Sequence, residues 1–177
     1  MITVARHARP GNVVDLGCGT GTQLAGLSDD YVPFGIEIST EAAVAADRLF
    51  RARGGWAVNQ TSLAGLRSFP DGFFTAATLR SYLEHELQPR AVLTELRRTL
   101  APGGIAIVKV PNFASWNRRL TGRKWCGLRY PDHVNYFTPA SLRAMTAACG
   151  YRIRFGPTDR LPTSDNMYAV LVKSVGR

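Results

Sequence analysis

Short apolar runs alternate with amphipathic segments along most of this 177-residue chain. Apolar runs of about four to eight residues between glycine, proline or polar residues are typical of buried strands. They predict strands over residues 13–16, 34–38, 56–59, 73–79, 105–110, 151–155 and 168–173. Helical patterns separate these strands, over residues 22–28, 40–53, 89–100 and 139–149. Strands that alternate with helices predict a parallel sheet covered on both faces.

Three of the predicted helices have recognisable ends. Ser39 precedes an alanine-rich helix that we expect to stop before Gly54, because serine caps helix N-termini and glycine ends helices. Thr138 and Pro139 open the last helix with a capping residue and a proline at the first helical position. The helix over residues 89–100 ends before the run P-G-G at 102–104.

A glycine-rich turn follows the first predicted strand. Gly17, Gly19 and Gly21 stand at alternate positions, where the chain must leave the strand sharply and bring bare backbone against a ligand. Glu37 comes 20 positions after Gly17, at the end of the second strand. An acid there is placed to bind both hydroxyls of a ribose. The turn and the acid together predict a nucleotide site.

The run D-L-G-C-G-T-G at 15–21 resembles the first motif of class I S-adenosylmethionine-dependent methyltransferases. A dinucleotide fold would show G-x-G-x-x-G instead. The resemblance covers roughly residues 13–151 and extends to the small-molecule branch that includes the ubiquinone-type O-methyltransferases. Its further motifs are L-E-H at 83–85, L-R-R-T-L-A-P-G-G at 96–104, V-P-N at 110–112 and P-D-H-V-N-Y-F-T at 131–138.

The resemblance implies an α/β fold, a Rossmann-like three-layer sandwich with a seven-stranded, mostly parallel sheet whose last strand is antiparallel. We expect one methyltransferase domain over residues 1–177. Relatives carry cap helices before the first motif, and only 12 residues precede Val13, so we expect those helices to be short or absent. The aromatic-rich stretch 112–137 is expected to be an irregular lid or substrate-binding insert, as long loops in compact domains often are.

S-adenosylmethionine is the cofactor that the resemblance implies. The residues assigned to it are Asp15, Gly17, Cys18, Gly19, Gly21, Glu37, Ile38, Gln60, Ser62, Leu63 and Arg80. Relatives commonly have an acid after the third strand to bind the adenine amino group, and this chain has none there. We therefore expect Gln60 or Ser62 to accept that hydrogen bond through a neutral oxygen, with Leu63 against the ring.

Methyl transfer from a sulfonium needs alignment and a deprotonated acceptor more than elaborate acid–base chemistry. His133 and His85 are the candidate bases, because an imidazole titrates near neutrality. We expect Tyr136, Trp125 and Arg129 to bind the substrate. Some related O-methyltransferases are thought to use a divalent cation, which Glu84 and His85 could hold. Two side chains are a thin shell and magnesium prefers oxygen ligands, so no metal ligands are assigned.

The net charge is +9, from 22 Lys and Arg against 13 Asp and Glu. Five of the basic residues gather within the stretch 112–137, namely Arg118, Arg119, Arg123, Lys124 and Arg129. They are consistent with an anionic acceptor drawn into the site by positive potential. A solvated basic surface is the plainer explanation, and single-stranded nucleic acid also favours arginines among aromatics. No recognised nucleic-acid module accompanies them, so we disfavour that partner.

Composition indicates one cytoplasmic domain. The 45% hydrophobic content suffices for one core, and no segment approaches the ~20 apolar residues of a membrane span or resembles a secretion signal. Three scattered cysteines suggest neither a disulfide framework nor a zinc site. A homodimer could complete the pocket.

The sequence thus predicts a transferase that uses S-adenosylmethionine to methylate an oxygen of a small, anionic metabolite. Two alternatives stay open. One is a noncatalytic domain that keeps the methyltransferase fold, which the missing adenine acid would suit. The other is a nucleic-acid-modifying methyltransferase.

Overall fold

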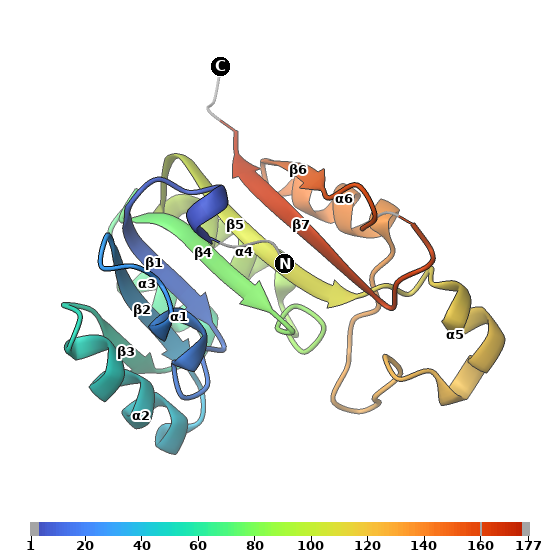
Figure 1. The fold of residues 1–177 in the computed structure, drawn as a ribbon, viewed down its shortest axis with the longest axis horizontal. Coiled ribbons are helices and arrows are strands. Elements are labelled where there is room, and N and C mark those ends of the chain that lie inside the picture. Colours follow the sequence, from blue (N-terminus) through green and yellow to red (C-terminus); the bar gives the residue numbers. More distant parts are fainter. Residues whose placement is uncertain (1–3, 160, 175–177) are drawn as a thin grey trace.

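Seven strands form one sheet in the order β3-β2-β1-β4-β5-β7-β6 in the computed structural model, which describes residues 4–159 and 161–174 (Figure 1). The outermost residues of the predicted 1–177 domain lie outside these described ranges. The strands are β1 (Gly11–Leu16), β2 (Tyr31–Glu37), β3 (Trp56–Asn59), β4 (Phe74–Arg80), β5 (Leu100–Pro111), β6 (Tyr151–Phe155) and β7 (Asn166–Lys173). The first five strands pair in parallel, and β7 runs antiparallel to both β5 and β6. The predicted mostly parallel sheet with an antiparallel last strand is confirmed.

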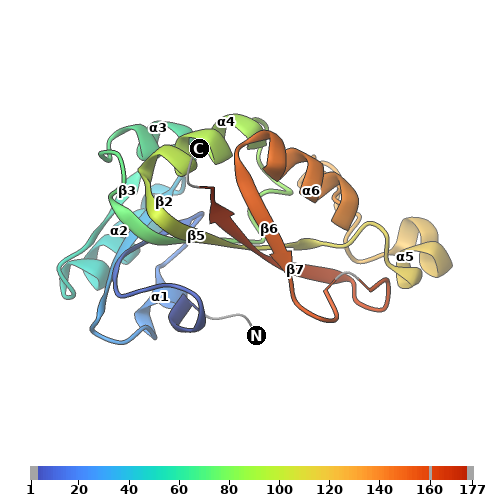
Figure 2. The ribbon, with the colours of Figure 1, turned by 90° about the horizontal axis from the view of Figure 1, so that it is seen from above.

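Helices cover both faces of the sheet (Figure 2). They are α1 (Thr22–Ala25), α2 (Thr40–Arg51), α3 (Ser62–Arg67), α4 (Pro89–Thr99), α5 (Trp116–Thr121) and α6 (Pro139–Ala148), with short 3₁₀ turns η1 (Val4–Arg6) and η2 (Gly122–Lys124). Seen from above, α3, α4 and α6 lie along one face, and α1 lies on the other.

Neighbouring residues of β1 belong to opposite cores, because successive side chains of a strand point to opposite faces. Val14 packs in a cluster with Leu93 of α4 and Leu142 of α6. Val13 packs in a second cluster with Leu24 of α1 and Phe50 of α2. Two cores on either side of one sheet confirm the predicted three-layer sandwich.

Two predicted helix starts are confirmed in atomic detail. The Ser39 side chain accepts a hydrogen bond from the amide of Ala42 at 3.4 Å and caps α2. Thr138 caps α6 and forms a reciprocal capping box with Ser141, and Pro139 is the first helical residue. These local signals were sufficient because each capping residue satisfies free amides of its own helix.

Other boundaries differ from the prediction. The helix expected over 22–28 ends at Ala25, and the Arg53 guanidinium binds the carbonyl oxygens of Leu24, Ala25, Ser28 and Tyr31 around this end. Helix α3 was not predicted, although Thr61 caps it. The stretch 112–137 is not wholly irregular, because it contains α5 and η2.

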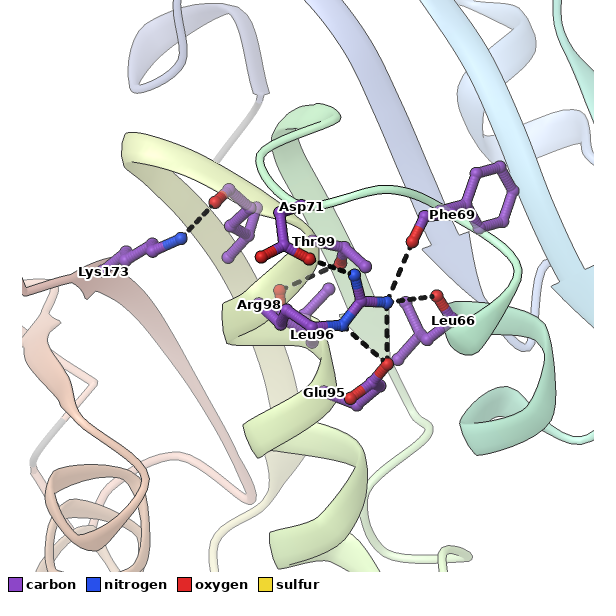
Figure 3. Close-up of polar contacts among 9 residues, drawn as sticks. Leu66, Phe69, Asp71, Glu95, Leu96, Arg98, Thr99 and Lys173 are labelled. Atoms are coloured by element: carbon purple, nitrogen blue, oxygen red, sulfur yellow. Dashed lines mark hydrogen bonds and ion pairs between the residues drawn. The ribbon is translucent and has the colours of Figure 1, made fainter.

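The amino-terminal edge of the sheet is held by ion pairs (Figure 3). Arg98 of α4 binds Asp71 at 2.5 Å and Glu95 at 2.7 Å, and it also donates to the carbonyl oxygen of Phe69 at 2.9 Å. Lys173 of β7 donates to the carbonyl oxygen of Leu100 at 2.5 Å. An open cavity of about 780 Å³ lies at this edge. The Arg98 and Lys173 side chains that line it already bind protein groups, so we assign these two side chains a structural role.

Candidate active site

The glycine turn lies at the carboxyl end of β1, between β2 and β4. Gly17, Gly19 and Gly21 have φ angles of 70°, 53° and 82°, in the left-handed region that favours glycine. A Cβ on Gly21 would lie 2.9 Å from the Phe50 ring, whereas a Cβ on Gly19 would meet no atom within 4 Å. The turn therefore packs against the core at Gly21 and leaves open space at Gly19.

Glu37 ends β2 beside this turn. Its carboxylate accepts hydrogen bonds from the backbone amides of Gly19 and Ser39, each at 2.9 Å. Each carboxylate oxygen has further acceptor capacity, which a pair of vicinal hydroxyls can use. The predicted ribose acid is therefore fixed in position at the strand end, where open α/β sheets bind ligands.

A cavity of about 490 Å³, here named the Glu37 cavity, opens next to this carboxylate. The predicted cofactor residues that line it are Gly17, Glu37, Ile38, Gln60, Ser62 and Leu63. The remaining wall comes mainly from Ser81 and the turn after β4. That turn includes Glu86, whose carboxylate accepts hydrogen bonds from the Tyr82 hydroxyl and from the amide of Gln88. Sequence motifs gave no signal for Glu86, which gives this cavity a second carboxylate in addition to Glu37.

Asp15 is a predicted cofactor residue that does not line the cavity. Only 3% of its surface is exposed, and its carboxylate accepts hydrogen bonds from Thr78 at 2.5 Å and Gln23 at 3.5 Å. Burial raises the pKa of Asp15 to about 7, although the hydrogen bond from Thr78 opposes the shift. A ligand that reaches Asp15 would have to do so through a bridging group.

Cys18 turns its side chain away from the Glu37 cavity. A Cβ on Gly35 of β2 would lie 2.5 Å from the Cys18 sulfur, so the thiol fills the space that this glycine leaves. Burial raises the pKa of the Cys18 thiol to about 12, and the thiol stays neutral. Only the backbone of Cys18 is available to a ligand. Arg80, Gly19 and Gly21 do not line the cavity either.

Ser81, directly after β4, has a φ of 53°, a conformation uncommon outside glycine. Its amide donates to the carbonyl oxygen of Lys109 at 3.0 Å, which holds the turn in this shape. Ser81 and His85 line both the Glu37 cavity and a second cavity of about 250 Å³. The two cavities therefore adjoin at this turn.

The second cavity, here named the histidine cavity, brings together the two predicted bases. The rings of His85 and His133 meet edge to face, with centroids 4.7 Å apart. Each Nδ1 lies 2.8 Å from a backbone carbonyl oxygen, that of Asp132 for His85 and that of Gly127 for His133. A carbonyl oxygen only accepts, so Nδ1 carries the proton and a neutral ring presents its lone pair at Nε2.

Glu84 shares this cavity and is 2% exposed. Its Oε2 is buried and has no hydrogen-bond partner among the described residues. Burial raises the pKa of Glu84, and the nearby His85, His133 and Lys109 oppose that shift. The sequence motif L-E-H pointed to Glu84, but it could not show that His133 would line the same cavity.

Asn135 fixes the segment that carries His133, and sequence reasoning missed it. Its side-chain amide donates to the carbonyl oxygens of Leu83 at 3.0 Å and Glu86 at 2.6 Å. The Glu84 carbonyl oxygen in turn accepts from the amides of Val134 and Asn135, at 2.8 and 3.0 Å. These four hydrogen bonds join the turn after β4 to residues 133–135. The sequence feature that could have indicated this role is the asparagine in P-D-H-V-N-Y-F, two positions after His133.

The three predicted substrate residues are placed differently from one another. Arg129 lines the histidine cavity. Trp125 is buried behind its wall, where its indole nitrogen donates to Asp165 at 2.7 Å. The Tyr136 ring packs on Phe113 with ring centroids 5.3 Å apart, and its hydroxyl is buried with no hydrogen-bond partner in the part of the chain that the structure describes. The structure therefore brings one of the three to the cavity.

Asp165 anchors the stretch 112–137 to the loop before β7. It accepts hydrogen bonds from Ser115 at 2.8 Å and Asn117 at 2.6 Å, in addition to Trp125. Partial burial alone would raise the pKa of Asp165, but these hydrogen bonds lower it overall. Of the five basic residues of the stretch, only Arg129 lines a described cavity, and Arg118 instead lies 4.0 Å above the Phe113 ring. Because the Asp165 carboxylate already accepts hydrogen bonds from Ser115, Asn117 and Trp125, we assign it to holding this stretch and not to binding substrate.

Two further sequence predictions are answered by the structure. Cys18, Cys126 and Cys149 are free thiols, as expected. Among the helices of residues 4–159 and 161–174, none is long and apolar enough to cross a membrane.

A glycine turn and an acid at the ends of adjacent parallel strands define a nucleotide-cofactor domain of the α/β class. A family model described as "Methyltransferase domain" matches residues 3–154, and the chain belongs to this family. The sequence is 36% identical over 118 residues to an uncharacterized 37.1 kDa protein in transposon TN4556 of Streptomyces fradiae, covering 63% of this chain and 33% of that protein.

Named relatives are more distant. The identity is 26% over 159 residues to a ubiquinone biosynthesis O-methyltransferase of Paraburkholderia xenovorans, covering 82% of this chain and 66% of that one. It is 28% over 177 residues to a demethylmenaquinone methyltransferase of Thermus thermophilus, covering 87% and 80%. The chain therefore spans only 33% and 66% of the first two relatives described.

Solved structures share the fold. A SAM-dependent methyltransferase of Archaeoglobus fulgidus superposes with a TM-score of 0.75 at 15% identity, covering 96% of this chain and 89% of that chain. A SAM-dependent methyltransferase of Thermotoga maritima, titled a possible histamine N-methyltransferase, gives 0.72 at 20% identity, covering 97% and 86%. The fold is that of the SAM-dependent methyltransferases.

Proposed function

We propose that this protein transfers the methyl group of S-adenosylmethionine to an oxygen atom of a small, anionic metabolite. One observation carries the proposal. The Glu37 cavity, lined by the glycine-turn motif and its acid, adjoins the histidine cavity at Ser81 and His85. A cofactor in the first cavity and an acceptor in the second would have their reactive atoms at this junction.

In the Glu37 cavity, the Glu37 carboxylate binds the ribose hydroxyls. Gln60 and Ser62 offer neutral oxygens to the adenine amino group, and Glu86 adds a carboxylate to the same cavity. Leu63 provides an apolar surface for the ring. Gly17 of the glycine turn and Ser81 would hold the methionine part, with Asp15 acting through a bridging group.

The reaction is a direct displacement. Bound S-adenosylmethionine would supply a methyl carbon on a sulfonium, and the acceptor oxygen would bond to that carbon as the carbon–sulfur bond breaks and its electron pair stays on sulfur. The acceptor proton leaves to Nε2 of His133 or His85, whose Nδ1 protons are held by backbone carbonyls. The protein contributes alignment and a base in this scheme.

Positive charge supports an anionic acceptor. Lys109 and Arg129 line the histidine cavity with the two histidines. The Asp165 and Glu84 carboxylates also line it. Hydrogen bonds from Ser115, Asn117 and Trp125 already occupy the oxygens of Asp165, and burial raises the pKa of Glu84, which favours its neutral form. The relative named as a ubiquinone biosynthesis O-methyltransferase supports oxygen as the acceptor atom.

The stretch 112–137 supplies Cys126, Gly127, Arg129 and His133 to the histidine cavity. These lining residues support its role as the substrate-binding insert. Its two ends pair with each other through a bridge between Asn112 and Phe137, so the stretch forms a closed loop.

The test compares matched acceptors, such as hydroxybenzoates and their neutral methyl esters, by the rate of S-adenosylhomocysteine formation. We expect kcat/KM about 10-fold or more higher for the carboxylates, with methylation on oxygen by mass spectrometry. Arg129→Ala should remove most of this preference, while Arg123→Ala, an exposed arginine outside the cavity, should keep it. Equal turnover of both acceptor classes would contradict the anionic acceptor, and methylation on nitrogen would contradict the oxygen.

A further inference from the structure

We propose that Glu86, in the turn after β4, accepts the hydrogen bond of the adenine amino group and so selects an adenine cofactor over one with an oxo group at that ring position. The inference rests on the proposed function, because it concerns the cofactor of the Glu37 cavity. Relatives commonly have an acid after the third strand for this contact, and this chain has none there. Two carboxylates line the cavity, those of Glu37 and Glu86. Glu37 is assigned to the ribose, so Glu86 is the carboxylate left for the base.

The Tyr82 side chain links Glu86 to the start of α3. Its hydroxyl donates a hydrogen bond to the Glu86 carboxylate. Burial and this hydrogen bond raise the pKa of Tyr82, and a side-chain hydrogen bond with Ser62 opposes the rise. Ser62 is the first residue of α3, and β3 ends three positions earlier at Asn59. The Glu86 carboxylate therefore lies one side chain away from the segment in which relatives carry the acid.

The Glu86 carboxylate is held in place before any ligand binds. One of its oxygens accepts from the Tyr82 hydroxyl, and the other accepts from the amide of Gln88 at 2.9 Å. The backbone carbonyl oxygen of Glu86 accepts from the side-chain amide of Asn135 at 2.6 Å. Each carboxylate oxygen can still accept a second hydrogen bond. A group that is already ordered loses little freedom when a ligand donates to it.

A carboxylate distinguishes the two kinds of purine, and the neutral side chains of the cavity do not. An ionised carboxylate only accepts hydrogen bonds, whereas the amide of Gln60 and the hydroxyl of Ser62 both donate and accept. The adenine amino group donates, and an oxo group in its place only accepts. Glu86 therefore attracts the first group and repels the second. Its hydrogen bond is also roughly twice as strong as one between neutral groups.

Two exposed apolar side chains are available to the faces of the ring. Ile38 and Leu87 line the same cavity and are 72% and 80% exposed. Ile38 follows β2 and Leu87 belongs to the turn after β4, and these strands lie on either side of β1 in the sheet. Covering apolar surface of this kind is favourable. A purine ring that covers Ile38 and Leu87 would bring its amino group to the turn that carries Glu86.

Selectivity between two nucleosides tests the inference without turnover. The full chain is titrated by calorimetry with S-adenosylhomocysteine and with S-inosylhomocysteine, which has an oxo group in place of the adenine amino group. We expect the wild type to bind the adenine compound at least about 100-fold more tightly, because a site built for a hydrogen bond rejects an analogue that lacks it.

Variants identify the group that discriminates. Glu86→Gln replaces the carboxylate by an amide that both accepts and donates. It should weaken S-adenosylhomocysteine binding about 10-fold or more and strengthen S-inosylhomocysteine binding, so that the ratio of the two affinities falls to about 10 or less. Glu41→Gln, on the exposed start of α2, is the matched control and should change neither affinity. Gln60→Ala should keep the wild-type ratio.

A Glu86→Gln variant that weakens both ligands equally would overturn the inference and give Glu86 a purely structural role. A ratio that is lost in Gln60→Ala and kept in Glu86→Gln would place the adenine acceptor on Gln60 instead. Equal binding of both compounds by the wild type would overturn the role of Glu86 and leave the proposed function standing. Binding of neither compound would overturn both.

Discussion

Glu37 accepts a hydrogen bond from the backbone amide of Gly19 at 2.9 Å and so joins the ends of β1 and β2. The two sequence features that predicted a nucleotide site are therefore in direct contact before any ligand binds. The remaining acceptor capacity of this carboxylate is directed at the Glu37 cavity. The carboxylate that we propose for the ribose is therefore held in place by the protein itself.

Replacing Glu37 by alanine should weaken S-adenosylmethionine binding about 10-fold or more, because two charge-assisted hydrogen bonds to the ribose are lost. Stability should fall by only about 1 kcal/mol, since water can reach the freed amides. Calorimetry and urea unfolding measure the two effects. Glu41→Ala, on the exposed start of α2, is the matched control and should change neither. Unchanged affinity in Glu37→Ala would remove Glu37 from the ribose site.

Asp15 should make stability depend on pH. Its folded pKa of about 7 lies above the ordinary 3.8, so the folded state retains a proton that the unfolded chain releases. This contribution is fully present below pH 3.8 and is lost as the pH rises to about 7, by roughly 4 kcal/mol in total.

Asp15→Asn cannot ionise and serves as the reference for this effect. Urea unfolding at several pH values should show the wild type losing stability relative to Asp15→Asn between pH 4 and 7, with no further change above pH 8. A stability difference that stays constant over this range would show that Asp15 titrates normally.

His133→Ala should lower kcat for an acceptor of high pKa by about 100-fold, in the range typical of a lost general acid–base group. Acceptors that are already ionised should be affected less, and S-adenosylmethionine affinity should be unchanged, because His133 lines only the histidine cavity. The measurement is turnover between pH 6 and 9 with acceptors of graded pKa. Equal losses for every acceptor would indicate a structural role.

Asn135→Ala should destabilise the fold by about 1 to 3 kcal/mol, because it removes two hydrogen bonds and leaves the carbonyl oxygens of Leu83 and Glu86 without them. Acceptor KM should rise as well, since the same contacts hold His133 in place. Urea unfolding and steady-state kinetics test both effects. Asn117→Ala removes one hydrogen bond on an exposed helix and should leave acceptor KM unchanged. Wild-type stability in Asn135→Ala would show that this clamp is dispensable.

The sequence was sufficient for the features that depend on local backbone demands. Gly17, Gly19 and Gly21 all adopt positive φ angles, and Ser39 and Thr138 both cap helices. The central strands β1, β2 and β4 were found because each is a short apolar run with a continuous buried stretch. Helix α3 escaped because its single glycine fits beneath Ile36, a tertiary contact that propensity does not encode.

The histidine cavity could not be derived from sequence alone. Glu84 and His133 are 49 positions apart, and their approach depends on contacts such as those of Asn135. The placement of the aromatic side chains in the stretch 112–137 could not be predicted from sequence for the same reason. Aromatic composition indicated a binding surface, but Asp165 holds Trp125 inward and Phe113 packs on Tyr136.

Calorimetric titration of the wild-type chain with S-adenosylmethionine, S-adenosylhomocysteine and NAD tests the central claim most directly. The account predicts 1:1 binding of the first two at micromolar concentration, accompanied by a rise in Tm, and no binding of NAD. Absence of S-adenosylmethionine and S-adenosylhomocysteine binding by folded protein, or a preference for NAD, would contradict it.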